Sequence, residues 1–577
     1  MPTKYFNIAG VCNPSKHYML PALARLPDVS KMIEGEYYFV LHAPRQSGKT
    51  TCLIELTERI NSEGRYYAIN CSLSSLQNIE ETDLAMSTVV DQIDTALRSS
   101  GVAKLKNLAF SFSKEPYMNR PTAKVRTMLN DICLSLDKEL VVFFDEADCL
   151  HENPLITFLT QIRDGYLYRY NFPETVFPRA MALVGMRNIR DYRHRVRPDD
   201  QSALLASPFN VTTESFSLAN FSKEEIESLY GQHTADTGQI FAGDAVERAW
   251  YWTEGQPWLV NAVARHVIVD QFKDDCSRIV TANEIDVAVH DMMLQNVTHF
   301  DSIANRLREP RVRRVIESVI VGAESFPNGV SSDDAGYVVD LGILQADSAR
   351  EHYWPANPVY TEVIARCMSR AIQKEIPKDF TNKWMDGTSI DMNGLLKEFQ
   401  TYWRKNSQAL KKKSKFRNHV LVNIRDALEY LTPKNGRDKN KENNDKILTE
   451  VTDELADNIR NDLTNLANEA FVHLVMFAFL QRVLNGGAVI NRDFGLLNKR
   501  CDIVVEYNGL LYPLEIKIKD NKTLKKSYEQ LYGYMDISGS PVGWLVVFDR
   551  DLNKSWKKKI FRRKIDYKGK TIRVIGC

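Results

Sequence analysis

A short loop between an apolar segment and a helical one constrains this chain more than any other feature. Residues 37–41 read Tyr-Tyr-Phe-Val-Leu, a candidate buried strand, and residues 43–51 read Ala-Pro-Arg-Gln-Ser-Gly-Lys-Thr-Thr. The loop matches the G-x4-G-K-[ST] phosphate-binding pattern, except that Ala43 replaces the first glycine. A helix is expected to begin near Lys49, and backbone N–H groups at its start would surround a phosphate. The sequence therefore predicts a phosphate site at a strand-to-helix junction.

Side chains within and beyond this loop predict a nucleotide bound with Mg²⁺. Lys49 is expected to reach the β- and γ-phosphates, and Thr50 to hold the metal. Residues 140–144, Leu-Val-Val-Phe-Phe, are the most apolar strand candidate, and Asp145 and Glu146 follow them. We expect Asp145 beside the metal and Glu146 near the attacking water. The alternative is a buried strand followed by an ordinary acidic turn.

Two more apolar segments, residues 66–69 and 180–184, alternate with helix-like stretches over the first 215 residues. Such alternation is typical of a parallel α/β sheet. Arg187 follows the last of these segments and is expected to sense the γ-phosphate, with a structural salt bridge as the alternative. One of four arginines that follow is a candidate arginine finger toward a neighbouring subunit, and the sequence does not select among them. They are Arg190, Arg193, Arg195 and Arg197.

The order of these motifs resembles prokaryotic ATPases of the AAA+/STAND type over residues 1–370. Residues 253–260, Thr-Glu-Gly-Gln-Pro-Trp-Leu-Val, complete the pattern. In this family a Gly-x-Pro segment starts a lid helix that touches the nucleotide, and a winged-helix domain follows. The resemblance thus implies ATP with Mg²⁺ as cofactor. The implied nucleotide contacts are Pro44, Arg45, Gln46, Ser47, Gly48, Lys49, Thr50, Thr51, Asp145, Arg187, Gln256 and Pro257.

A second site is predicted near the C-terminus by a hairpin signal. Asn508-Gly509 separates two apolar-rich segments, which is the pattern of a two-residue β-turn. In the register that this turn sets, Asp502 lies opposite Glu515, with Cβ atoms about 4.5–5.5 Å apart. Lys517 lies on the same face, two residues on. The opposite face is expected to be core, because it consists of Ile503, Val505, Tyr507, Leu510, Tyr512, Leu514 and Ile516.

Two opposed carboxylates destabilise a hairpin unless a cation lies between them. A hard divalent ion such as Mg²⁺ binds carboxylate oxygens and activates water, while Lys517 stabilises developing charge. The alternative is a solvent-facing strand whose charges pair with Lys517. Basic residues after the strand favour a phosphate substrate. They are Lys519, Lys522, Lys525 and Lys526.

This arrangement resembles the PD-(D/E)XK nuclease superfamily over residues 466–577. Cys501 precedes Asp502 where the motif has proline. The resemblance implies phosphodiester hydrolysis with Mg²⁺ or Mn²⁺, with Asp502, Glu515 and the Ile516 carbonyl as metal ligands. The implied catalytic residues are Asp502, Glu515, Lys517, Glu469 on an upstream apolar helix and Gln530 on the helix that follows.

Charge and composition limit the remaining classes. The chain has 577 residues and a formal net charge of +1, yet residues 466–577 hold 20 lysines and arginines against 11 aspartates and glutamates. A basic end suggests a polyanion partner, with a solvated surface as the alternative. No apolar run is long enough to span a membrane, and the N-terminus lacks a signal-peptide core. Nine cysteines without a CxxC pair indicate reduced thiols in a cytoplasm.

We therefore expect an α/β multidomain protein. Its parts are a P-loop parallel-sheet ATPase core (1–215), a helical lid (216–300), a winged helix (301–375), a helical linker or nuclease extension (376–465) and an α/β restriction-endonuclease-like domain (466–577).

The expected function is an ATP-dependent switch or motor coupled to a nuclease that cuts DNA, in defence or mobile-element biology. Assembly into a homo-oligomer through the ATPase core is expected. Two alternatives stay open: an ATP-dependent DNA-binding regulator, and a STAND-type signalling sensor without cleavage.

Overall fold

A computed structural model describes most of the chain, and it divides into two compact units. Unit 1 comprises Met1–Met292 with Asp340–Gly342, and unit 2 comprises Met293–Val339 with Ile343–Cys577. The residues described are 4–26, 29–111, 122–150, 152–169, 171, 175–186, 214–294, 298–320, 330–373, 384–413, 472–484, 488–491, 502–519, 524–549 and 554–577. No helix among them combines the length and the apolarity that crossing a bilayer requires. All eight cysteines in these ranges are free thiols.

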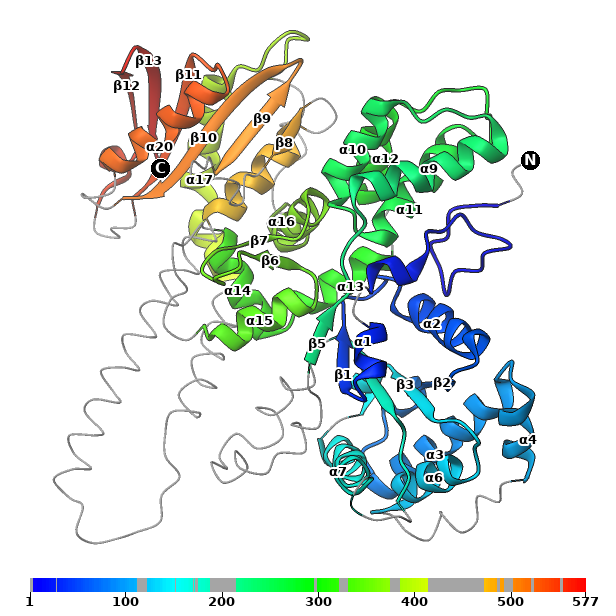
Figure 1. Cartoon of the computed structure of the whole chain (residues 1–577). Coiled ribbons are helices and arrows are strands. Elements are labelled where there is room, and N and C mark those ends of the chain that lie inside the picture. Colours follow the sequence, from blue (N-terminus) through cyan, green and yellow to red (C-terminus); the bar gives the residue numbers. More distant parts are fainter. Residues whose placement is uncertain are drawn as a thin grey trace, which may run out of the picture. The chain divides into compact units, whose positions relative to one another are not determined.

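Unit 1 is built on a five-stranded sheet in which every neighbouring pair is parallel. The strand order is β2-β3-β4-β1-β5 (Figure 1). The strands are β1 (Tyr38–His42), β2 (Tyr67–Ser72), β3 (Leu140–Asp145), β4 (Ala180–Gly185) and β5 (Glu214–Ser217). The four strands expected from apolar segments are confirmed. The fifth, Glu-Ser-Phe-Ser, was not predicted because it has no apolar run.

Helices cover both faces of this sheet. Alternation of side chains along β1 sends Phe39 and Leu41 into a core with α1 and α2, whereas Tyr38 and Val40 enter a core with α3, α4, α6 and α7. The result is an α/β/α layering. The helices are α1 (Val29–Glu34), α2 (Lys49–Glu63), α3 (Thr82–Ser99), α4 (Ala103–Ser111), α6 (Lys124–Leu134) and α7 (Glu152–Tyr168), with short 3₁₀ turns at Ala22–Arg25, Ser74–Leu76 and Ala147–Cys149.

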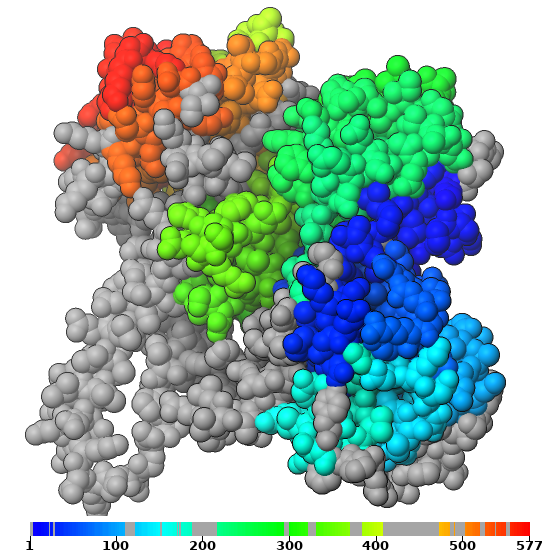
Figure 2. All heavy atoms as spheres, viewed as in Figure 1, coloured from blue at the N-terminus to red at the C-terminus, as the bar shows by residue number. Residues whose placement is uncertain are grey.

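A helical layer completes unit 1. It contains α9 (Lys223–Thr237), α10 (Gly243–Thr253), α11 (Pro257–Arg265), a π-helical turn (His266–Gln271) and α12 (Ala282–Leu294). A capping box starts α9: the Ser222 hydroxyl accepts from the Glu225 N–H, and the Glu225 carboxylate accepts from the Ser222 N–H. The N-terminal segment, residues 4–20, packs against these helices (Figure 2). Phe6 meets the Tyr230 ring edge-on at 5.6 Å, and Gln232 Nε2 donates to the Met19 carbonyl oxygen.

Unit 2 begins with a helical part that carries a small two-stranded ribbon. The helices are α13 (Thr298–Arg306), α14 (Pro310–Ile320), α15 (Ser332–Asp340) and α16 (Pro358–Gln373). The ribbon pairs β6 (Leu344–Ala346) with β7 (Tyr353–Pro355) in antiparallel fashion. Asp340 ends α15, and Gly342, at φ 71°, turns the chain into β6.

The rest of unit 2 is a six-stranded mixed sheet in the order β12-β13-β11-β10-β9-β8. The strands are β8 (Val489–Asn491), β9 (Ile503–Tyr507), β10 (Leu510–Ile518), β11 (Val542–Phe548), β12 (Phe561–Tyr567) and β13 (Lys570–Gly576). The helix α20 (Leu524–Ile537) covers one face, and α17 (Met392–Lys413) with the helical residues 472–483 covers the other (Figure 1). A short helix, α21 (Trp556–Lys559), precedes β12.

The described part of the 376–465 segment packs directly on this sheet. Phe399 and Trp403 of α17 contact the Phe548 ring, and Gln400 Nε2 donates to the Gly576 carbonyl oxygen at 2.6 Å. The described part of α17 therefore belongs to the packed core around this sheet.

Candidate functional site

The loop between β1 and α2 has the backbone of a phosphate-binding turn. Gly48 precedes α2 with φ 90°, a left-handed conformation that an L side chain adopts only with strain. Gln46 also has a positive φ, 59°. The first turn of α2 therefore presents its free N–H groups toward the loop. Ala43, which replaces the expected glycine, is buried, and its N–H donates to the Gly185 carbonyl oxygen at 3.2 Å.

Lys49 is held inside this loop by carbonyl oxygens. Its Nζ donates to Ala43 O at 2.6 Å and to Pro44 O at 2.8 Å. Burial lowers the pKa of Lys49 to about 8, although Asp148, Asp145 and Glu146 raise it. An anion in the loop would offset the burial penalty, because it would add an opposite charge beside the ammonium.

The acidic end of β3 meets the start of α2. Thr50 Oγ1 donates to Asp145 Oδ2 at 2.7 Å, and the Glu146 N–H donates to Asp145 Oδ1 at 2.9 Å. Burial raises the pKa of Asp145, against the hydrogen bond from Thr50. Glu146 is exposed and has φ 57°, a strained conformation of the kind that clusters at functional sites. The hydroxyl and carboxylate oxygens of Thr50 and Asp145 match the donors that Mg²⁺ takes.

Residues of the helical layer reach the loop as the Gly-x-Pro segment predicts. Gln256 caps α11, accepting from the Leu259 N–H at 2.6 Å, and its Nε2 lies 3.5 Å from the Gln46 carbonyl oxygen. Pro257 is the first residue of α11. Arg25 adds a contact that was not predicted, since its guanidinium donates to Ser47 O at 2.9 Å and to the Ala219 carbonyl oxygen.

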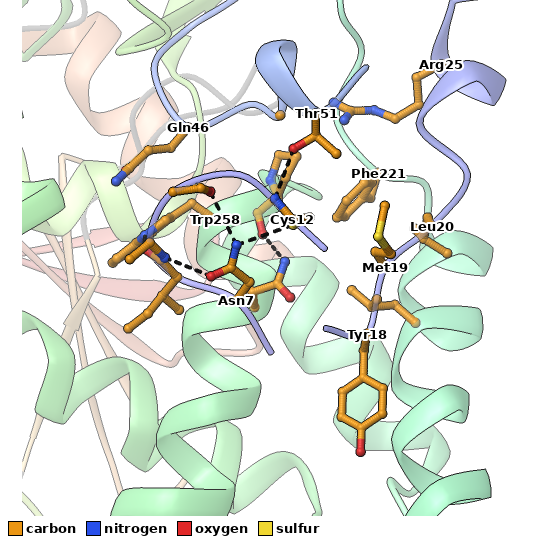
Figure 3. Close-up of a pocket in the computed structure, with 17 residues that line it drawn as sticks. Asn7, Cys12, Tyr18, Met19, Leu20, Arg25, Gln46, Thr51, Phe221 and Trp258 are labelled. Carbon is orange, nitrogen blue, oxygen red and sulfur yellow. Dashed lines mark hydrogen bonds between the residues drawn. The ribbon is translucent and has the colours of Figure 1, made fainter. Parts of the chain in front are cut away.

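A pocket of about 130 Å³ opens beside this loop (Figure 3). Its wall combines the N-terminal segment, the loop with α2, and α11. Trp258 Nε1 donates to the Ile8 carbonyl oxygen at 2.8 Å, and the Cys12 N–H donates to Thr51 Oγ1 at 3.3 Å. The residues that line it include Asn7, Cys12, Tyr18, Gln46, Gly48, Thr51, Phe221, Trp258 and Asn261.

Sequence reasoning missed most of this pocket. No motif marks the N-terminal segment, and Trp258 meets Ile8 across 250 residues of chain. Asp148 was also missed, although the tetrapeptide Asp-Glu-Ala-Asp at 145–148 was an available signal. The expected loop, metal and lid residues are brought together. Arg187 and the candidate arginine fingers lie outside the described residues.

The C-terminal hairpin has the predicted register. Tyr507 pairs with Leu510 and Ile503 pairs with Leu514, so the next pair along is Asp502 with Glu515. Asn508 and Gly509 both have positive φ, 49° and 75°, as the turn requires. The expected apolar face is buried away from the turn, whereas Tyr507 is half-buried and Leu510, beside the turn, is 48% exposed. The buried members are Ile503, Val505, Tyr512, Leu514 and Ile516.

Two carboxylates and one lysine converge on the face that α20 partly covers. Lys517 Nζ lies 2.8 Å from Glu515 Oε1 and 3.7 Å from Asp502 Oδ2. Asp502 Oδ2 also accepts from the Ile516 N–H at 2.6 Å. The Glu515 side chain is only 1% exposed, so the alternative of a solvent-facing strand is wrong for this residue.

Glu515 carries the largest electrostatic penalty in this group. Burial and, after it, the neighbouring Asp502 raise its pKa to about 8, against Lys517, which lowers it. Glu515 Oε2 is buried, and no hydrogen-bond donor reaches it within the part of the chain that the structure describes. A divalent cation would offset both the burial and the repulsion between the two carboxylates.

The surroundings of this pair only partly match the expectation. Gln530 lies on α20, half-buried, four residues before Tyr534. Lys519 is 3.3 Å from Asp549, which Lys554 also contacts, so Lys519 is already paired. Glu469, Lys522 and the Lys525 side chain lie outside the description. Across the residues described, no group of three or more His, Cys, Asp and Glu side chains is arranged to hold a metal.

The chain matches no protein-family model and no curated protein. Among solved structures, the ORC2 protein of Aeropyrum pernix aligns with 61% of this chain and 93% of its own, at 11% identity and TM-score 0.37. The Thermotoga maritima RuvB Holliday junction branch migration motor aligns with 59% of this chain and 94% of its own, at 14% identity and TM-score 0.31. Cdc6p from Pyrobaculum aerophilum aligns with 64% of this chain and 98% of its own, at 12% identity and TM-score 0.33. At such TM-scores these matches carry no argument, and the sites are interpreted from their own geometry.

Proposed function

We propose that unit 1 binds ATP with Mg²⁺ and acts as an AAA+-like, ATP-hydrolysing switch or motor. The observation that carries this proposal is Lys49, a lysine with a lowered pKa whose amine bonds two loop carbonyls in front of the start of α2. A nucleotide phosphate would replace these carbonyls as the partner of Lys49 and accept from the N–H groups of the first turn.

The roles of the other residues follow from their contacts. Thr50 and Asp145 would hold the Mg²⁺, which supplies charge neutralisation between the phosphates. Glu146 is exposed beside Asp145 and would orient the attacking water. Gln256 would report the state of the loop to the helical layer, because it joins Gln46 to the start of α11.

A second function, metal-dependent phosphodiester hydrolysis, is proposed for unit 2. The observation that favours it is the buried Glu515 carboxylate, 2.8 Å from Lys517, with its second oxygen unpaired among the described residues. Asp502, Glu515 and the Ile516 carbonyl would hold a Mg²⁺ or Mn²⁺ ion, which supplies an activated water. Lys517 would position that water and stabilise the developing negative charge, with Gln530 and Glu469 as auxiliary contacts.

Nucleic acid, and DNA in particular, is the proposed substrate. Exposed basic side chains lie on α21 and on β12, an edge strand of the same sheet, and such a surface attracts a phosphate backbone. These are Lys557, Lys558, Arg562, Arg563 and Lys564. A DNA-binding regulator without cleavage, and a sensor that only assembles on ATP, are the competing outcomes.

The test is cleavage of plasmid and single-stranded DNA with Mg²⁺ or Mn²⁺, with and without ATP. Wild type is compared with Asp502→Ala and Lys49→Ala, and ATP binding and turnover are measured in parallel. We expect wild type to cut and Asp502→Ala to be inactive while still binding ATP. Lys49→Ala should lose ATP binding and reveal whether nucleotide drives or restrains cutting. Absence of cleavage under every condition would overturn the nuclease proposal, and absence of ATP binding would overturn the switch.

A further inference from the structure

One side chain of the pocket beside the phosphate loop has an unused hydrogen-bond acceptor. Asn261 lies on α11, one turn after Pro257, and is 9% exposed. Its Nδ2 donates to the Pro257 carbonyl oxygen at 2.8 Å. Its Oδ1 is buried, and none of the described residues donates to it. A buried acceptor without a donor costs free energy, so a ligand that donates a hydrogen bond to this atom would be stabilised.

The orientation of this amide is fixed by its surroundings. Exchange of the amide oxygen and nitrogen would set Asn261 Oδ1 against the Pro257 carbonyl oxygen, two acceptors facing each other. The hydrogen bond of Nδ2 to Pro257 therefore keeps Oδ1 as the free atom of the amide. Asn261 therefore offers its carbonyl oxygen as an acceptor to whatever the pocket holds.

A second amide of this pocket, that of Asn7, behaves differently. Asn7 also lines the pocket, but its Oδ1 accepts from the Ala9 N–H at 3.1 Å and its Nδ2 donates to the Gly10 carbonyl oxygen at 3.3 Å (Figure 3). Both ends of this amide are thus used within its own loop. Asn7 shapes the wall, whereas the Asn261 carbonyl oxygen has capacity left for a ligand.

We propose that Asn261 selects adenine by accepting a hydrogen bond from the amine at the 6-position of this base. The proposal rests on nucleotide binding at the neighbouring phosphate loop. Phe221 and Trp258 supply aromatic walls suited to a planar ring. Adenine carries an amine at its 6-position and hypoxanthine or guanine carries a carbonyl there, so the latter two would set an acceptor against Asn261 Oδ1.

The test compares the affinities of ATP, ITP and purine riboside triphosphate, which has no substituent at the 6-position. Binding is measured with Mg²⁺ on the full chain. We expect wild type to bind ATP about tenfold or more tightly than either analogue, since one buried hydrogen bond is gained or lost. In Asn261→Ala and Asn261→Leu, the affinity for ATP should fall to within about threefold of the affinity for ITP. Asn7→Ala, the matched control, should weaken ATP and ITP by the same factor.

The outcomes separate this inference from the proposed function. Equal affinity of wild type for ATP and ITP would overturn the role of Asn261 and leave the phosphate site standing. An equal loss of affinity for ATP and ITP in Asn261→Ala would also overturn the role of Asn261 in base selection, because it would indicate only a structural role. Failure of every nucleotide to bind wild type would overturn the phosphate site itself. If both variants fail to fold, the analogue series on wild type still decides.

Discussion

The phosphate loop of unit 1 and the carboxylate pair of unit 2 each combine one lysine with aspartate or glutamate side chains. The uncompensated charge is positive in unit 1 and negative in unit 2. In unit 1 burial falls on the cation, and the pKa of Lys49 is lowered to about 8. In unit 2 burial falls on an anion, and the pKa of Glu515 is raised to about 8. The same residue types thus form one site that needs an anion and one that needs a cation.

The partners of each lysine explain the difference. Lys49 Nζ bonds two neutral carbonyl oxygens, so its charge is only distantly compensated by Asp145 and Asp148. Lys517 bonds Glu515 directly, but it cannot neutralise two carboxylates at once. Ligand identity therefore follows from which charge is left in excess, and not from the residue types alone.

The largest expected effect is on cleavage. Glu515→Gln removes the excess negative charge and one proposed metal ligand, so we expect DNA cleavage in Mn²⁺ to fall about 100-fold or more. ATP affinity should stay within about twofold of wild type, because Glu515 belongs to the other unit. Cleavage assays and nucleotide titrations on the same preparations check both values. A parallel loss of ATP binding would break the separation of the two sites.

Nucleotide affinity should depend on pH through Lys49. The pKa of this lysine in the empty site is about 8, and the charged form binds phosphate. ATP affinity should therefore be flat below about pH 7 and fall up to about tenfold per pH unit above pH 8. Lys49→Arg, which stays charged, should remove this dependence even if its affinity is lower. A flat wild-type profile up to pH 9.5 would contradict the lowered pKa.

Bound ATP should protect a cysteine of the pocket. Cys12 lines the wall and its N–H donates to Thr51, which follows Thr50, the proposed Mg²⁺ ligand. We expect ATP with Mg²⁺ to slow alkylation of Cys12 about fivefold, as read by peptide mass spectrometry. Cys276 is the internal control because it lies outside the pocket. Equal protection of both thiols would indicate a global change and not occupation of this pocket.

The smallest effect is on stability. A carboxyl whose folded pKa is raised contributes stability below its ordinary pKa of 4.5, and that contribution is lost as pH rises through about 8. Glu515→Gln should thus raise the unfolding midpoint by a few °C at pH 8.5 in EDTA, with little change at pH 4.5. Saturating Mg²⁺ should stabilise wild type and not the variant. A midpoint that drops at both values of pH would mean that Glu515 stabilises the fold as an anion.

The two regions also differ in how far the sequence predicts them. The hairpin register follows from Asn508-Gly509 because turn geometry is local, and the pairing of Asp502 with Glu515 comes with it. The loop, Lys49 and Asp145 were likewise predictable because a strand, a turn and a helix lie in sequence. The pocket wall was not, since residues 7–12 reach α11 only in the folded chain. Burial of Glu515 beneath α20 was missed for the same reason.

The most direct test of the opposite excess charges at the two sites is to measure how many protons are taken up or released when each ligand binds. ATP–Mg²⁺ is titrated into Asp502→Ala, and Mn²⁺ into Lys49→Ala, by calorimetry at pH 8 in buffers of different ionisation enthalpy. Because both pKa values are about 8, ATP should bring uptake of about half a proton as Lys49 becomes fully charged. Mn²⁺ should release about half a proton as Glu515 ionises. Proton changes of the same sign at both sites, or none at either, would contradict the account.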